Sequence, residues 1–123
     1  MAKEYTTSLE LLKYAASISL YEKLVVQLRK DFGLANINLD LPENVGPLEL
    51  KTILKEKIYV LLLERFTDYL NLLYVVDVPE KAFSAIESTD VVEVAEKVSY
   101  LVLKREWQKV WLKQSYDSGN HNA

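Results

Sequence analysis

Residues 8–32 have the sequence SLELLKYAASISLYEKLVVQLRKDF, and this stretch decides the fold. Its large apolar side chains recur at alternating spacings of three and four residues, at Leu11, Tyr14, Ile18, Tyr21, Val25, Leu28 and Phe32. This spacing draws one apolar stripe along a helix. Thr7 and Glu10 form the S/T-x-x-E pattern of a helix start, and Gly33 suits the left-handed residue that follows a helix end. We therefore expect one helix over residues 8–32.

The residues that follow this helix have a different pattern of apolar and polar side chains. Over residues 34–46, Ile37, Leu39 and Leu41 alternate with polar side chains, which is the period of an extended chain with one buried face. This segment should lie against helices or pair with its copy in a dimer. About 13 extended residues span roughly 43 Å, more than a 25-residue helix at about 38 Å. The segment is therefore an extended crossover, and the helices it joins can be parallel or antiparallel.

The rest of the chain predicts further helices. Pro47 opens a helix over residues 47–76, whose second part is apolar over an arc of about 200° and so needs cover from two or three directions. A short helix is expected at residues 80–87 and a long one from residue 90 to about 115. The expected fold is all-α, a helical bundle of three long helices and one short helix with the crossover at 34–46. Residues 1–115 form a single domain, and residues 116–123 form a disordered polar tail.

The last long helix has two apolar faces. Its first half carries one stripe, made of Val91, Val94, Ala95, Val98, Leu101 and Val102. Further along, the apolar residues move to nearly the opposite side, at Tyr100, Leu103, Trp107, Val110 and Trp111. Two contact faces explain this change, one for the core of the chain and one for a partner, since Trp is enriched at interface centres. The alternative is a helix that is central near its end, with the tryptophans covered by the first helix or the crossover.

The composition argues against catalysis. The chain has no Cys, and its one His is His121 in the expected tail, so thiol chemistry and transition-metal sites lack their ligands. There is no Gly-rich phosphate loop and no Gly-x-Ser-x-Gly turn. We expect no enzyme and no cofactor. A small-ligand or carboxylate–metal enzyme stays open as an alternative, on Glu93 and Glu96 with Glu64 and Asp68.

The sequence also bears on location. The first eight residues turn polar at once, without the apolar run of a signal peptide. The longest apolar run, Ile58–Leu63, has six residues, far fewer than the about 20 of a transmembrane helix. We expect a cytoplasmic protein that does not enter a membrane.

The function expected from these patterns is non-catalytic protein association, as an adaptor, regulator or inhibitor acting as a homodimer on an unidentified protein partner. The candidate partner-binding residues are Tyr100, Leu103, Trp107, Val110, Trp111, Arg105 and Arg65. The two arginines are candidates to satisfy tyrosine hydroxyls or to pair across the interface. The alternative is nucleic-acid binding by the interleaved tryptophans and basic residues, namely Lys104, Arg105, Lys109 and Lys113. The net charge of -3 opposes this alternative, and basic groups at a helix end also complement the helix dipole.

Overall fold

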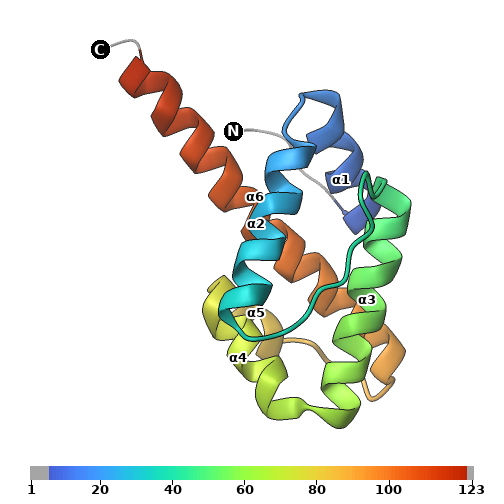
Figure 1. The fold of residues 1–123 in the computed structure, drawn as a ribbon. Coiled ribbons are helices and arrows are strands. Elements are labelled where there is room, and N and C mark those ends of the chain that lie inside the picture. The colour runs from blue at the N-terminus through green and yellow to red at the C-terminus, as the bar shows by residue number, and fades with distance from the viewer. Residues whose placement is uncertain (1–5, 122–123) are drawn as a thin grey trace.

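The computed structural model describes residues 6–121, with side chains for residues 6–117, and the regular structure in that range is entirely helical (Figure 1). The helices are α1 (Ser8–Ser17), α2 (Tyr21–Leu34), α3 (Pro47–Glu64), α4 (Phe66–Val76), α5 (Glu80–Ser84) and α6 (Val91–His121). The all-α class is therefore confirmed, but the first two expected long helices are each divided in two. Within the described residues, no helix combines the length and the apolarity needed to cross a membrane.

The break between α1 and α2 falls in the middle of the expected first helix. Ser19 takes the left-handed backbone conformation, with φ of 63°. The Leu20 amide donates to the Ala15 carbonyl at 2.9 Å, and the Ser19 amide donates to the Ala16 carbonyl at 3.1 Å. This pair of bonds is the Schellman pattern of a helix end. The predicted stripe survives the break because both helices turn it toward the same core.

The capping signals of this pair of helices had different outcomes. Thr7 and Glu10 form the expected capping box: the Glu10 amide donates to Thr7 Oγ1 at 3.1 Å, and the Thr7 amide donates to Glu10 Oε1 at 3.2 Å. The prediction for Gly33 is wrong, because α2 continues through Leu34. Asn36 takes the left-handed conformation instead, with φ of 60°, and Asn tolerates it better than most residues do.

The expected crossover is non-helical except for its first residue, which belongs to α2, and it contains turns at residues 35–36 and 43–44. The apolar side chains of the alternating pattern are buried, namely Ile37, Leu39 and Leu41. The Tyr21 hydroxyl, at the start of α2, donates to the carbonyl of Val45 at 2.6 Å, just before α3 begins. The crossover thus returns the chain to the end of the bundle where α2 started. Figure 1 shows the result, with α2 and α3 running in the same direction.

The expected helix over residues 47–76 is divided at Arg65. Pro47 occupies the first turn of α3 as predicted, but the Arg65 backbone leaves the helical region with φ of -142° and ψ of 59°. The chain turns there, and α4 sets off in a new direction (Figure 1). The short helix α5 is also less extensive than the predicted 80–87, although Phe83 and Ile86 pack on the core.

The central element is α6, which packs against each of α1 to α5. It follows Asp90, whose Oδ1 accepts the amide of Val92 at 2.9 Å. It crosses the bundle diagonally, and its far end extends past the other helices (Figure 1). The helix runs to His121, so residues 116–121 of the expected tail are helical, while residues 122–123 lie outside the described range.

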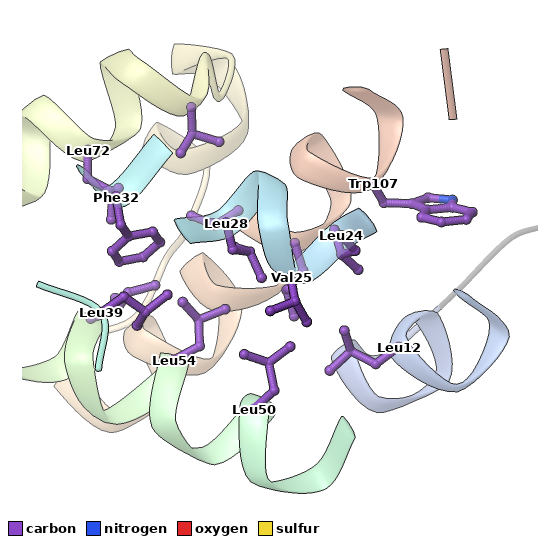
Figure 2. Close-up of a cluster of buried hydrophobic side chains, with 14 of the residues drawn as sticks. Leu12, Leu24, Val25, Leu28, Phe32, Leu39, Leu50, Leu54, Leu72 and Trp107 are labelled. Atoms are coloured by element: carbon purple, nitrogen blue, oxygen red, sulfur yellow. The ribbon is translucent and has the colours of Figure 1, made fainter. Parts of the chain in front are cut away.

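Figure 2 shows where these elements meet. Side chains from α1 to α4, the crossover and α6 converge on one cluster, labelled at Leu12, Leu24, Val25, Leu28, Phe32, Leu39, Leu50, Leu54, Leu72 and Trp107. The core is thus closed by the last helix of the chain.

Candidate functional site

The second apolar face of α6 lies in the core of the chain itself. Leu103 and Trp107 are 0% and 1% exposed, and Val110 is also buried. Tyr100 and Trp111 are half-buried and pack against the same cluster. Most of the surface that the sequence assigns to a partner is therefore covered within one chain.

The cover for the tryptophans comes from α1. Tyr14 meets Trp107 edge to face, with ring centroids 6.2 Å apart and an interplanar angle of 84°. Trp111 packs beside Trp107 at a centroid distance of 6.1 Å. The alternative of a central helix with its tryptophans under the first helix is the one that describes Trp107. Its Nε1 is buried and has no hydrogen-bond partner among the described residues, so apolar contacts hold the ring.

The two candidate arginines contact acidic residues of the same chain. Arg105 joins α6 to the end of α4: its Nε donates to the Asp77 carbonyl at 3.1 Å, and its Nη2 lies 3.1 Å from Asp77 Oδ2. Arg65 is exposed and pairs with Asp68 at 2.6 Å. Arg105 therefore fixes α6 to α4, while the exposed Arg65 pair contributes little to stability.

The structure gives less support to the nucleic-acid alternative than the sequence does. Trp107 is buried and cannot stack on a base, and Arg105 and Lys109 are both held in ion pairs with carboxylates of the chain. Stacking and phosphate contact both need exposed side chains. The geometry therefore does not bring the predicted basic and aromatic residues together on one open surface.

Three of the four acidic residues considered for a metal site, Glu93, Glu96 and Asp68, are paired with cations. Glu96 Oε1 lies 3.8 Å from Lys51 Nζ and 3.7 Å from Lys55 Nζ, and Glu93 pairs with Lys97 at 3.1 Å. Among the residues that the structure describes, no group of three or more His, Cys, Asp or Glu could hold a metal ion.

Two carboxyl groups that the sequence patterns did not single out, those of Asp31 and Glu106, meet Lys109 inside the fold between α2 and α6. We call Asp31, Glu106 and Lys109 the α2–α6 cluster. Asp31 is 3% exposed and Glu106 is 0% exposed. Lys109 Nζ lies 2.7 Å from Asp31 Oδ2 and 3.4 Å from Glu106 Oε1, and Gln27 Nε2 donates to Asp31 Oδ2 at 3.2 Å. A groove of about 330 Å³ lies beside the cluster, lined in part by Gln27 and Val110, but none of the three cluster residues lines it.

The two carboxyl groups of this cluster titrate in opposite directions. Burial, hydrogen bonding with Asp31 and repulsion from it together raise the pKa of Glu106 to about 9, and Lys109 offsets only part of this. Burial also acts to raise the pKa of Asp31, but hydrogen bonds from Glu106, Lys109 and Gln27 outweigh it and lower that pKa. At neutral pH, Glu106 is thus a neutral acid and Asp31 an ion.

The sequence did carry a signal for this cluster. Val98, Val102, Glu106 and Val110 follow one another at intervals of four residues, so Glu106 falls on an apolar line. Asp31, three residues after Leu28, likewise falls on the buried side of α2. A charged residue inside an apolar stripe is either paired or neutral, and here Asp31 is paired and Glu106 is neutral.

A second feature is apolar and faces solvent. Along α4, Phe66, Leu70 and Tyr74 are spaced by four residues and are 54%, 45% and 84% exposed. Just before the turn at Arg65, Val60 and Leu63 of α3 are 41% and 52% exposed. We call these five residues the α3–α4 face. They account for part of the broad apolar arc that the sequence predicted for this region.

No family model matches the sequence, and no curated protein or solved structure matches the chain. A functional proposal for this protein therefore depends on its own geometry. Two features stand out from an ordinary bundle: the exposed α3–α4 face and the enclosed α2–α6 cluster.

Proposed function

We propose that the protein is a non-catalytic association module that forms a homodimer through its α3–α4 face. The observation that carries this proposal is the row of large exposed side chains on α4, Phe66, Leu70 and Tyr74, together with the exposure of Leu63 at the end of α3. A soluble monomer seldom exposes a contiguous apolar patch larger than a few hundred Å². A second copy of the same chain is the occupant that we assign to this surface.

The size of the face supports a dimer. Two aromatic and three aliphatic side chains, each roughly half exposed or more, present on the order of 600 Å² of apolar surface. A standard interface buries about 800 Å² on each partner, including its polar rim. The face is thus large enough to be the centre of a specific contact.

The charges around the face also suit a copy of itself. Arg65 lies at the turn between the two helices, with Glu64 before it and Asp68 one turn after it. A two-fold interface brings the same patch of two subunits together, so it is favourable when the rim carries both signs. Arg65 of one copy can then pair with Glu64 or Asp68 of the other. In the proposed dimer, Arg65 therefore contributes an ion pair between the subunits.

This proposal moves the interface away from the tryptophans. In this proposal Leu103 and Trp107 are core residues, because both are already covered by their own chain. Tyr100 and Trp111 keep some exposure but lie on α6 and not on the α3–α4 face.

The test is the mass of the protein in solution with and without the apolar face. Light scattering coupled to gel filtration should give a dimer for the wild type at micromolar concentration. Leu70→Glu places a charge in the centre of the face and should give a folded monomer. Leu48→Glu is the matched control, because Leu48 is 62% exposed at the other end of α3 and should remain in a dimer. A monomeric wild type, or an unchanged mass for Leu70→Glu, would contradict the proposal.

A further inference from the structure

The α2–α6 cluster encloses more acid than base. It holds two carboxyl groups and one ammonium group in a contact where Glu106 has no exposed surface. Two ionised carboxylates offer each other only acceptors, so a hydrogen bond between them forms only when one carries a proton. Lys109 and Gln27 both donate to Asp31, whereas neither oxygen of Glu106 receives a hydrogen bond from a described residue. The proton therefore belongs on Glu106.

We propose that this cluster is a proton-dependent latch that holds α6 on α2. With Glu106 protonated, its hydroxyl donates to Asp31, and the charges of Asp31 and Lys109 balance. When Glu106 ionises, two carboxylates face one ammonium group in a buried site, and the contact between the helices is weakened. An uncompensated buried charge is among the most destabilising features that a fold can contain.

The protonation state of Glu106 depends on two neighbouring charged groups. The charged groups that act on Glu106 are Asp31 from α2 and Lys109 from α6 itself. Elsewhere in the described core, the buried polar side chains are Ser8 and Ser99, which do not titrate. The other ion pairs between α6 and the rest of the described chain join Lys51 and Lys55 to Glu96 and Asp77 to Arg105, and none of these groups is among those that shift the pKa of Glu106. The cluster reaches the surface at Lys109, whose side chain is 23% exposed, while the side chain of Glu106 is 0% exposed.

The direction of the pH effect follows from the two states of Glu106. In the unfolded chain its pKa is about 4.5, and in the folded chain burial raises the pKa to about 9. The stabilisation is fully present below pH 4.5 and is lost as pH rises toward 9, because only the unfolded chain releases its proton in that interval. The folding equilibrium then weakens by up to tenfold for each pH unit. Asp31 acts in the opposite sense, since its lowered pKa removes stability only below about pH 4.

The first experiment compares variants across this interval. Urea midpoints of the full chain, followed by far-ultraviolet circular dichroism from pH 5 to pH 9, should decrease for the wild type. In Glu106→Gln the decrease should be absent, because the amide stays neutral and can still donate to Asp31. The matched control is Glu93→Gln, an exposed glutamate on the same helix, which should keep the wild-type slope. Equal slopes for the wild type and Glu106→Gln would overturn the latch.

A second measurement does not depend on the folding of a variant. The carbon-13 resonance of the Glu106 side-chain carboxyl in the native wild type should keep its protonated value beyond pH 7 and titrate near pH 9. The titration should move to lower pH in Asp31→Asn, because the repulsion from the Asp31 charge is removed while the charge of Lys109 stays. A wild-type resonance that titrates near pH 4.5 overturns the proposal.

Discussion

Replacing Trp107 with alanine separates a structural role for the tryptophan face from a role in partner binding. Trp107 is 1% exposed and lies between Tyr14 of α1 and Trp111 on the next turn of α6. A buried indole removes on the order of 200 Å² from water, worth about 5 kcal/mol at 25 cal/mol per Å². Because alanine retains part of that area and the site relaxes, we expect Trp107→Ala to lower the free energy of unfolding by about 3–5 kcal/mol.

The assay is equilibrium unfolding in urea, followed by far-ultraviolet circular dichroism, which does not rely on the deleted fluorophore. A chain of 123 residues has a total stability of roughly 6–18 kcal/mol, so Trp107→Ala should lose a large part of it. Trp111→Ala is the comparison, since Trp111 is only half-buried and its loss should be about half as large. Equal losses for the two variants would refute this account. So would a Trp107→Ala protein that keeps its stability and changes only its oligomeric mass, because that result would put Trp107 at an interface.

Three further substitutions test local features of the fold in the same unfolding assay. Ser19→Gly should raise stability by about 1 kcal/mol, because glycine adopts the left-handed conformation at that helix end without strain; a loss would contradict the strain argument. Tyr21→Phe should cost about 1–2 kcal/mol, since it leaves the buried carbonyl of Val45 without its donor, and a neutral outcome would mean that water replaces the hydroxyl. Thr7→Ala removes the acceptor of the Glu10 amide and should cost about 1 kcal/mol, with Thr7→Ser as the control that retains it.

The periodicity of the sequence was sufficient to place the core but not the helix ends. Leu11, Leu28 and Phe32 are buried as the stripe predicts, on both sides of a break that the stripe does not reveal. The spacing of apolar residues does not reveal the break at Ser19. The spacing continues across the break because both helices turn their apolar side chains toward one core. A search for glycine also misses it, since the left-handed residues here are Ser19, Asn36, Asn44 and Asp77.

The extended crossover was predictable because its alternation is local. Ile37, Leu39 and Leu41 are each separated from the next by one polar residue, and no tertiary knowledge is needed to see this. The direction of α3 relative to α2 was not predictable, because it depends on where the segment leads the chain. The bond from Tyr21 to Val45 is one long-range contact that ties the start of α3 to the start of α2.

The candidate site shows a sharper limit. The angular shift along α6 correctly identified a second apolar face, but whether that face meets α1 or a partner depends on the position of Tyr14 in space. The α2–α6 cluster joins Asp31 with Glu106 and Lys109, from distant parts of the chain, and a pattern read one helix at a time cannot pair them. The exposed α3–α4 face was partly visible, as an apolar arc too broad for one neighbour.

The position of α6 at the end of this fold has a consequence for how the protein is made. It packs on all five preceding helices, so their inward faces lack a common partner while a ribosome is still adding residues after Val91. At roughly 5–20 residues per second, the 31 residues of α6 take about 2–6 s to synthesise. During that interval the leucines of α3 that will face α6 stay in water or on a chaperone. We therefore expect the chain to acquire its native structure only after α6 has been synthesised, and a nascent chain arrested near residue 90 should be a chaperone substrate instead of a partly folded bundle.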